Sequence, residues 1–167
     1  MKHLKGSCHC GAVAFEFDTP APVPFMRCYC SICRKTAGGG GYCINIMGMA
    51  DSLQVKGRDQ VKTYRAVKDK QVPKDQQVLC QDRFFCRTCA SYLWAHSDEW
   101  PEWIYPYASA IDTELPVPQE MTSIMLDYVP QWADPRKLPG RTQGNDLYNE
   151  YPAYSLAQWH DDHGASA

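Results

Sequence analysis

Nine cysteines are the strongest constraint on what this chain of 167 residues can fold into. Seven of them form three tight clusters, which are Cys8-His-Cys10, Cys28-Tyr-Cys30-Ser-Ile-Cys33 and Cys86-Arg-Thr-Cys89. The count is odd and the first residues contain no apolar leader, so the disulfide framework of a secreted domain is disfavoured. Tetrahedral zinc needs several thiolates about 2.3 Å from the ion, and clusters with this spacing can supply them. The sequence therefore predicts metal binding.

The spacing also indicates how the seven thiols divide. Three of them lie within six residues and can surround one ion together, namely Cys28, Cys30 and Cys33. The two outer pairs then make a site of four, formed by Cys8, Cys10, Cys86 and Cys89. Four thiolates are typical of structural zinc, whereas three protein ligands with one free position are typical of catalytic zinc. Other partitions stay open, among them one in which Cys28 and Cys30 join Cys8 and Cys10.

Charge and hydropathy exclude several classes of protein. Seventeen Lys and Arg residues against nineteen Asp and Glu residues give a formal net charge of −2, which argues against bulk-charge binding to nucleic acid or to a membrane surface. No apolar run approaches the roughly 20 residues that a membrane-spanning helix needs. We expect a soluble, cytoplasmic protein.

Alternating apolar residues predict a mainly β fold with few short helices. Val13, Phe15 and Phe17 share one face of a strand. The proline-rich residues 19–24 are expected to form a surface connection. The turn at 28–36 is expected to open a short helix that Gly38 to Gly41 terminate, and the polar residues 68–77 are expected to form a loop. Further strands are expected at 42–47, 53–56, 61–64, 78–85, 92–95 and, as the last core strand, 121–126.

The last forty residues differ from the rest. We expect residues 1–127 to form a zinc-binding catalytic β-domain and residues 128–167 to form an aromatic, proline-rich C-terminal extension packed on it. Ser155 is expected to cap a short helix. The sequence His160-Asp-Asp-His163 is interpreted as a solvated end rather than as a metal-binding tract. A lid over the three-cysteine group and a contact in a homodimer are both compatible with this extension.

Some residues near the clusters are further candidates. Five cations lie within three residues of a predicted ligand and can offset thiolate charge; they are Arg27, Arg34, Lys35, Arg83 and Arg87. Of these, Arg34 and Lys35 are the candidates for binding substrate carboxylates. Cys43 and Cys80 are interpreted as core thiols rather than as a fourth ligand of the second ion.

The order of the motifs resembles a known family. Gly6-Ser-Cys-His-Cys-Gly11, Arg27-Cys-Tyr-Cys-Ser-Ile-Cys-Arg34 and Phe85-Cys-Arg-Thr-Cys89 resemble the glutathione-dependent formaldehyde-activating enzyme family, which includes centromere protein V. Similarity at Thr63-Tyr64 and at Ala110-Ile-Asp112 extends the resemblance over about residues 4–127. Ala90 departs from the family pattern, which typically has glycine after the last cysteine.

The resemblance implies a complex β-fold with two zinc ions per chain. Cys8, Cys10, Cys86 and Cys89 would hold the structural ion, and Cys28, Cys30 and Cys33 would hold the catalytic one. The implied activity is that of a carbon–sulfur lyase that joins a thiol, glutathione or a similar one, to formaldehyde or another small aldehyde, giving S-(hydroxymethyl)glutathione. The alternative is a zinc-scaffolded binding module without catalysis.

Overall fold

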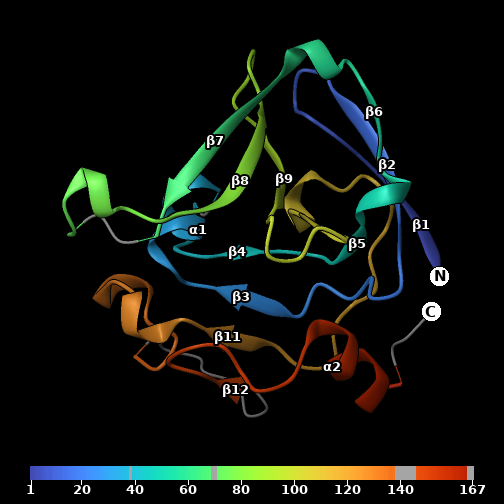
Figure 1. The fold of residues 1–167 in the computed structure, drawn as a ribbon. Coiled ribbons are helices and arrows are strands. Elements are labelled where there is room, and N and C mark those ends of the chain that lie inside the picture. The colour runs from blue at the N-terminus through green and yellow to red at the C-terminus, as the bar shows by residue number, and fades with distance from the viewer. Residues whose placement is uncertain (38, 69–70, 138–145, 165–167) are drawn as a thin grey trace.

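The structure, a computed structural model, describes residues 1–37, 39–68, 71–137 and 146–164 (Figure 1). Within these residues the chain forms three β-sheets and two short helices, α1 (Ser31–Thr36) and α2 (Leu156–Asp162). Single turns of 3-10 helix connect several strands, at Ala50–Ser52, Arg58–Gln60, Lys74–Gln76, Ala108–Ala110, Leu126–Tyr128 and Gln131–Ala133. The prediction of a mainly β fold with few short helices is confirmed. No helix among the described residues is long and apolar enough to cross a membrane.

Parts of three sequence expectations lie outside the described residues. Gly38, which was expected to help end the first helix, lies outside the described residues, and α1 itself ends at Thr36. The same holds for two residues of the expected loop, 69–70, and for parts of the C-terminal extension, residues 138–145 and 165–167.

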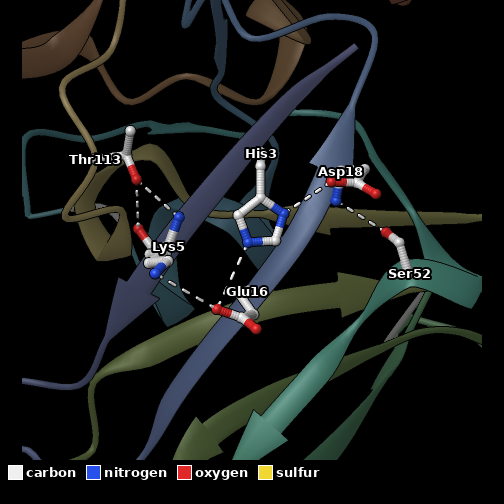
Figure 2. A network of polar contacts seen from close by, with 6 residues as sticks. All are labelled: His3, Lys5, Glu16, Asp18, Ser52 and Thr113. Atoms are coloured by element: carbon white, nitrogen blue, oxygen red, sulfur yellow. Dashed lines mark hydrogen bonds and ion pairs between the residues drawn. The ribbon is translucent and has the colours of Figure 1, made fainter.

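The first sheet is antiparallel and has the order β1-β2-β6, with β1 (Lys2–Ser7), β2 (Ala14–Thr19) and β6 (Gln54–Lys56). Leu4 pairs with Phe17 across β1 and β2, and both side chains are buried, because alternate residues of a strand face the core. Figure 2 shows the polar network on the exposed side of this sheet, which joins His3, Lys5, Glu16, Asp18, Ser52 and Thr113.

The second sheet is antiparallel and has the order β5-β10-β9-β8-β7. Its strands are β5 (Gly48–Met49), β7 (Val61–Val67), β8 (Leu79–Cys86), β9 (Tyr92–His96) and β10 (Trp103–Pro106). The ring of Trp94 stacks on Phe84 at 5.1 Å and meets Phe15 of the first sheet at 5.3 Å, both between ring centroids. These aromatic contacts join the first two sheets into one core.

The third sheet has the order β12-β11-β3-β4, with β3 (Met26–Cys28), β4 (Cys43–Ile44), β11 (Thr122–Ile124) and β12 (Asp146–Leu147). Strands β3, β11 and β12 lie side by side in the lower part of Figure 1. β11 runs parallel to both of its neighbours, so the C-terminal part of the chain returns to the start of the three-cysteine cluster. Residues 121–126 were expected to form the last core strand, and β11 lies within them and is buried throughout; β12 follows it as a two-residue strand in which Leu147 is only partly buried.

Helix α2 covers the proline-rich segment that follows β2. Ala21, Val23 and Phe25 are only 1%, 8% and 1% exposed, so the expected surface connection is wrong. Trp159 of α2 stacks on Phe25 with ring centroids 3.7 Å apart, and His160 Nε2 accepts a hydrogen bond from Val23 N at 3.0 Å. His160 is therefore buried, and the expected solvated end is wrong for this residue, whereas residues 161–163 are exposed as expected. The division into residues 1–127 and 128–167 stays a prediction.

Candidate metal centres

The two outer cysteine pairs meet in space. Cys8 and Cys10 follow β1, while Cys86 ends β8 and Cys89 closes the turn after it. Their four Sγ atoms lie within 4.8 Å of one another, with Cys8 to Cys10 at 3.5 Å and Cys10 to Cys86 at 3.8 Å. A tetrahedron with zinc–sulfur distances of about 2.3 Å has sulfur–sulfur edges of about 3.8 Å. The four sulfurs therefore have the spacing that tetrahedral zinc requires.

Backbone geometry shapes both turns of this four-cysteine group. The amide of Val13 donates to Cys8 Sγ at 3.2 Å, and the amide of Thr88 donates to Cys86 Sγ at 3.4 Å. Such donors favour the thiolate form of the sulfur. Ala90 closes the second turn with a left-handed φ of 59°, and its amide donates to Cys86 O at 2.9 Å. The turn thus keeps a conformation that favours glycine even though the residue is alanine.

The remaining cluster forms a three-cysteine group at the start of α1. Cys28 ends β3, Cys30 is the N-cap of α1 and Cys33 lies in its first turn. Their Sγ atoms lie within 4.8 Å of one another, and the Cys33 amide donates to Cys30 Sγ at 3.3 Å. Hydrogen bonds from the thiols of Cys28 and Cys30 lower the pKa of Cys33. The sulfurs thus gather as four and three, and the open alternative that combines Cys28 and Cys30 with Cys8 and Cys10 is not the arrangement found.

Two further thiols were interpreted as core residues. Cys43 is buried and lies opposite Cys28 in the register of β3 and β4. Its Sγ donates to Asn45 Oδ1 at 3.5 Å, and it does not belong to either group of clustered sulfurs. Cys80 is only partly buried in β8.

A cavity of about 500 Å³ opens beside the three-cysteine group. Its polar lining includes Cys28, Cys33, Asn45, Gln81 and Arg83. The other walls are apolar or aromatic and come from several elements, with Trp100, Trp103 and Tyr105 on one side and residues 151–156 of the C-terminal segment on another. We call this space the inner cavity. A predominantly apolar cavity with a few polar groups is typical of a small-molecule site.

Arg83 is the charged group of this cavity. It is 3% exposed, and its Nη1 donates to the Tyr107 hydroxyl at 2.9 Å. Its Nε is buried without a hydrogen-bond partner in the part of the chain that the structure describes. Burial alone would lower the pKa of the Arg83 guanidinium, but the negative charge of Cys33, together with Tyr107 and Cys43, outweighs this effect and raises the pKa. The guanidinium is therefore charged inside an apolar enclosure.

Arg34 and Lys35, the candidates for substrate carboxylates, lie elsewhere. They line a second, more open cavity of about 770 Å³, which Cys8, Ser91 and Asp112 also line. Successive residues of a helix point about 100° apart, so Arg34 and Lys35 of α1 turn away from the side that carries Cys33. We call this second space the outer cavity. The sequence indicated Arg83 only as one of five nearby cations and gave no role to Asn45 or Tyr107. For the C-terminal extension it left a lid over the three-cysteine group open, and residues 151–156 lie beside that group in the inner cavity.

Comparisons with known proteins agree with the motif order. Residues 3–129 match the family described as glutathione-dependent formaldehyde-activating enzyme. A curated relative from Halomonas elongata, named provisionally as a glutathione-dependent formaldehyde-activating enzyme, is 47% identical over 157 residues, or 94% of each chain. The crystal structure of a Rhodobacter sphaeroides protein shares 26% identity with a TM-score of 0.50 and covers 68% of this chain and 92% of its own. Residues 151–156 of the inner cavity lie beyond the family match.

Proposed function

The chain belongs to the glutathione-dependent formaldehyde-activating enzyme family, and on this premise we propose that it joins glutathione, or a similar thiol, to formaldehyde or another small aldehyde. This is a carbon–sulfur lyase reaction written in the direction of addition. A carbon–sulfur bond forms, and the thiol proton ends on the former carbonyl oxygen. The observation that carries the proposal is the inner cavity, whose wall contains Cys28 and Cys33.

We further propose two zinc ions per chain. Cys8, Cys10, Cys86 and Cys89 would hold a structural ion, because four thiolates complete a tetrahedron. Cys28, Cys30 and Cys33 would hold a catalytic ion. When bound there, zinc supplies a Lewis acid that favours the thiolate form of a substrate thiol.

The chain's own residues would exclude water and orient the aldehyde. The aromatic side chains of Trp100, Trp103 and Tyr105 line the inner cavity and disfavour a competing water molecule. Asn45 Oδ1 accepts from Cys43, so the amide NH₂ of Asn45 stays available as a donor. A donor in this wall would stabilise the negative charge that develops on the aldehyde oxygen.

Exchange NMR of glutathione and formaldehyde, with and without the zinc-loaded protein, tests the proposal. The uncatalysed addition proceeds in solution, so the measured quantity is the increase in exchange rate between free glutathione and its hydroxymethyl adduct. We expect this rate to rise in proportion to protein concentration. An unchanged rate with both ions bound would contradict the catalytic proposal and favour a binding module.

A further inference from the structure

We propose that the guanidinium of Arg83 binds a carboxylate of the thiol substrate inside the inner cavity. The inference rests on the proposed function of that cavity, since it assigns one end of the substrate to Arg83 and leaves the thiol end to the three-cysteine group. It moves the expected carboxylate contact away from Arg34 and Lys35, which line the outer cavity.

The first argument is the incomplete hydrogen bonding of a buried cation. The Arg83 side chain is almost completely buried, and its Nη1 donates a hydrogen bond to the Tyr107 hydroxyl. Nε has no partner among the described residues, and no described carboxylate forms an ion pair with this side chain. A buried charge is costly unless it is paired and hydrogen-bonded. The guanidinium is therefore ready to receive an acceptor from a ligand.

The second argument is the composition of the cavity. Arg83 is the one Lys or Arg among the described lining residues, and these include no Asp or Glu. A carboxylate that enters finds a single cation and no competing anion of its own type. Guanidinium groups bind carboxylates through paired N–H donors, and an apolar enclosure strengthens the attraction. The site would therefore select a thiol that carries a carboxylate.

The third argument concerns distance along the ligand. Arg83 and Cys33 both line the same cavity of about 500 Å³, which Cys28 also lines. One small molecule can therefore place its sulfur at the cysteine group and a carboxylate at the guanidinium. Tyr107, which is fully buried, fixes Nη1 and so limits the orientations that the guanidinium can adopt.

A competing explanation is that Arg83 serves only as a counter-ion. Zinc with three thiolates would carry a charge of −1, which one guanidinium offsets. This attraction accounts for the positive charge of Arg83 but supplies no acceptor for Nε, since hydrogen bonds require short, directed contacts. The two explanations differ in what Arg83→Gln changes: the counter-ion role predicts loss of zinc, and the carboxylate role predicts loss of ligand preference.

The experiment is calorimetric titration of the zinc-loaded full chain with glutathione and with glutathione diethyl ester, in which both carboxylates are blocked. The wild-type protein is expected to bind the acid roughly 10- to 100-fold more tightly than the ester, as for hydrogen bonds to a charged partner. Arg83→Gln should bind the two ligands equally and retain two zinc ions by native mass spectrometry. Arg58→Gln, which changes an exposed arginine outside both cavities, should behave as the wild type.

Each remaining outcome decides the question. A wild-type protein without acid preference, or an Arg83→Gln variant that keeps it, overturns the inference. If Arg83→Gln loses zinc, Arg83→Lys restores the charge without the planar pair of donors. Recovery of both zinc ions with a weakened acid preference would then support the inference, and recovery of both zinc ions with the full acid preference would show that charge alone suffices and overturn the guanidinium contact. An Arg83-dependent preference without faster exchange in the NMR experiment refutes the proposed function and leaves the inference standing. Faster exchange without an Arg83-dependent preference for the acid refutes the inference and leaves the proposed function standing.

Discussion

Cys33 and Arg34 are neighbours in α1, yet they line two different cavities. Cys33 faces the inner cavity with Cys28, and Arg34 faces the outer cavity with Cys8. Helix α1 therefore forms part of the partition between the two spaces. The chemistry proposed for the three-cysteine group belongs to the inner side, so substitutions on the two sides of α1 should have different consequences.

Cys86→Ser is expected to destabilise the whole chain. The four-cysteine group joins the start of the chain to the end of β8, and zinc bound there would restrain a long loop of the unfolded chain. Loss of this ion should lower the melting temperature markedly, as should removal of zinc by a chelator. Differential scanning calorimetry with Cys80→Ser as the matched control measures the effect. Equal melting temperatures for the two variants would contradict a structural ion.

Ala90→Gly is expected to stabilise the protein by about 1 kcal/mol, because a left-handed conformation is strained for alanine and not for glycine. The φ of Ala90 is 59°. Urea denaturation at saturating zinc measures the free energy of unfolding. Ala14→Gly, in the regular strand β2, is the matched control and should instead cost roughly 0.5–1 kcal/mol. A destabilised Ala90→Gly variant would argue against the left-handed turn.

His160 is expected to make stability fall as pH falls below about 6.5. Burial lowers the pKa of this histidine. Its Nδ1 donates to Leu156 O at 2.7 Å and its Nε2 accepts from Val23 N, so the neutral ring fits and the charged ring does not. His160 binds a proton more readily in the unfolded chain than in the folded one. Its contribution to the free energy of unfolding is therefore fully present above the pKa of the unfolded chain and is lost as pH falls through the lower pKa of the folded chain. Denaturation of the wild type and of His160→Gln across pH 5–8 measures it.

His3 provides an internal control of opposite sign. Its hydrogen bond to Asp18, at 2.8 Å, raises the pKa of His3, with a further contribution from Glu16 (Figure 2). Its contribution is present below the unfolded pKa and disappears as pH rises through the folded pKa. Because the side chain is exposed, we expect only a small effect on stability. An NMR titration of the two rings should show His3 titrating above His160, and the reverse order would contradict both assignments.

Trp159→Ala is expected to release helix α2 from the segment that it covers. The stack of Trp159 on Phe25 is the main aromatic contact of this small cluster, and truncation of a buried Trp costs about 3–5 kcal/mol. Hydrogen exchange should accelerate in residues 20–25 and 151–164, and binding in the inner cavity should weaken while two zinc ions stay bound. Trp132→Ala, at a tryptophan that is 64% exposed, should change exchange little. Unaltered protection after Trp159→Ala would mean that α2 does not depend on this stack.

Local patterns predicted the elements that depend on near neighbours. The cysteine spacing indicated groups of four and three, because a C-x-C pair on an extended segment and a C-x-x-C turn each bring two sulfurs together. The cap at Ser155 was also readable: its side chain accepts from the Gln158 amide at 3.1 Å. In both cases the chemistry that fixes the structure lies within a few residues.

Long-range contacts explain what the sequence did not reveal. Val23 and His160 are 137 positions apart, so neither the burial of the proline-rich segment nor that of the histidine could be inferred from its neighbours. The parallel pairing of β11 with β3 has the same origin. Arg34 and Arg83 are both cations near cysteines, and the sequence favoured Arg34 for the substrate carboxylate. Only the orientation of α1 and β8 places Arg34 at the outer cavity and Arg83 at the inner one.

The most direct test of the central claim is Cys30→Ser, compared with Cys80→Ser, by zinc counting and exchange NMR on the same samples. We predict that Cys80→Ser keeps two zinc ions and accelerates glutathione–formaldehyde exchange. Cys30→Ser should remain folded with one zinc ion, and its exchange rate should equal that of the uncatalysed reaction. Exchange by folded Cys30→Ser at the rate of the control would contradict a catalytic role for the three-cysteine group.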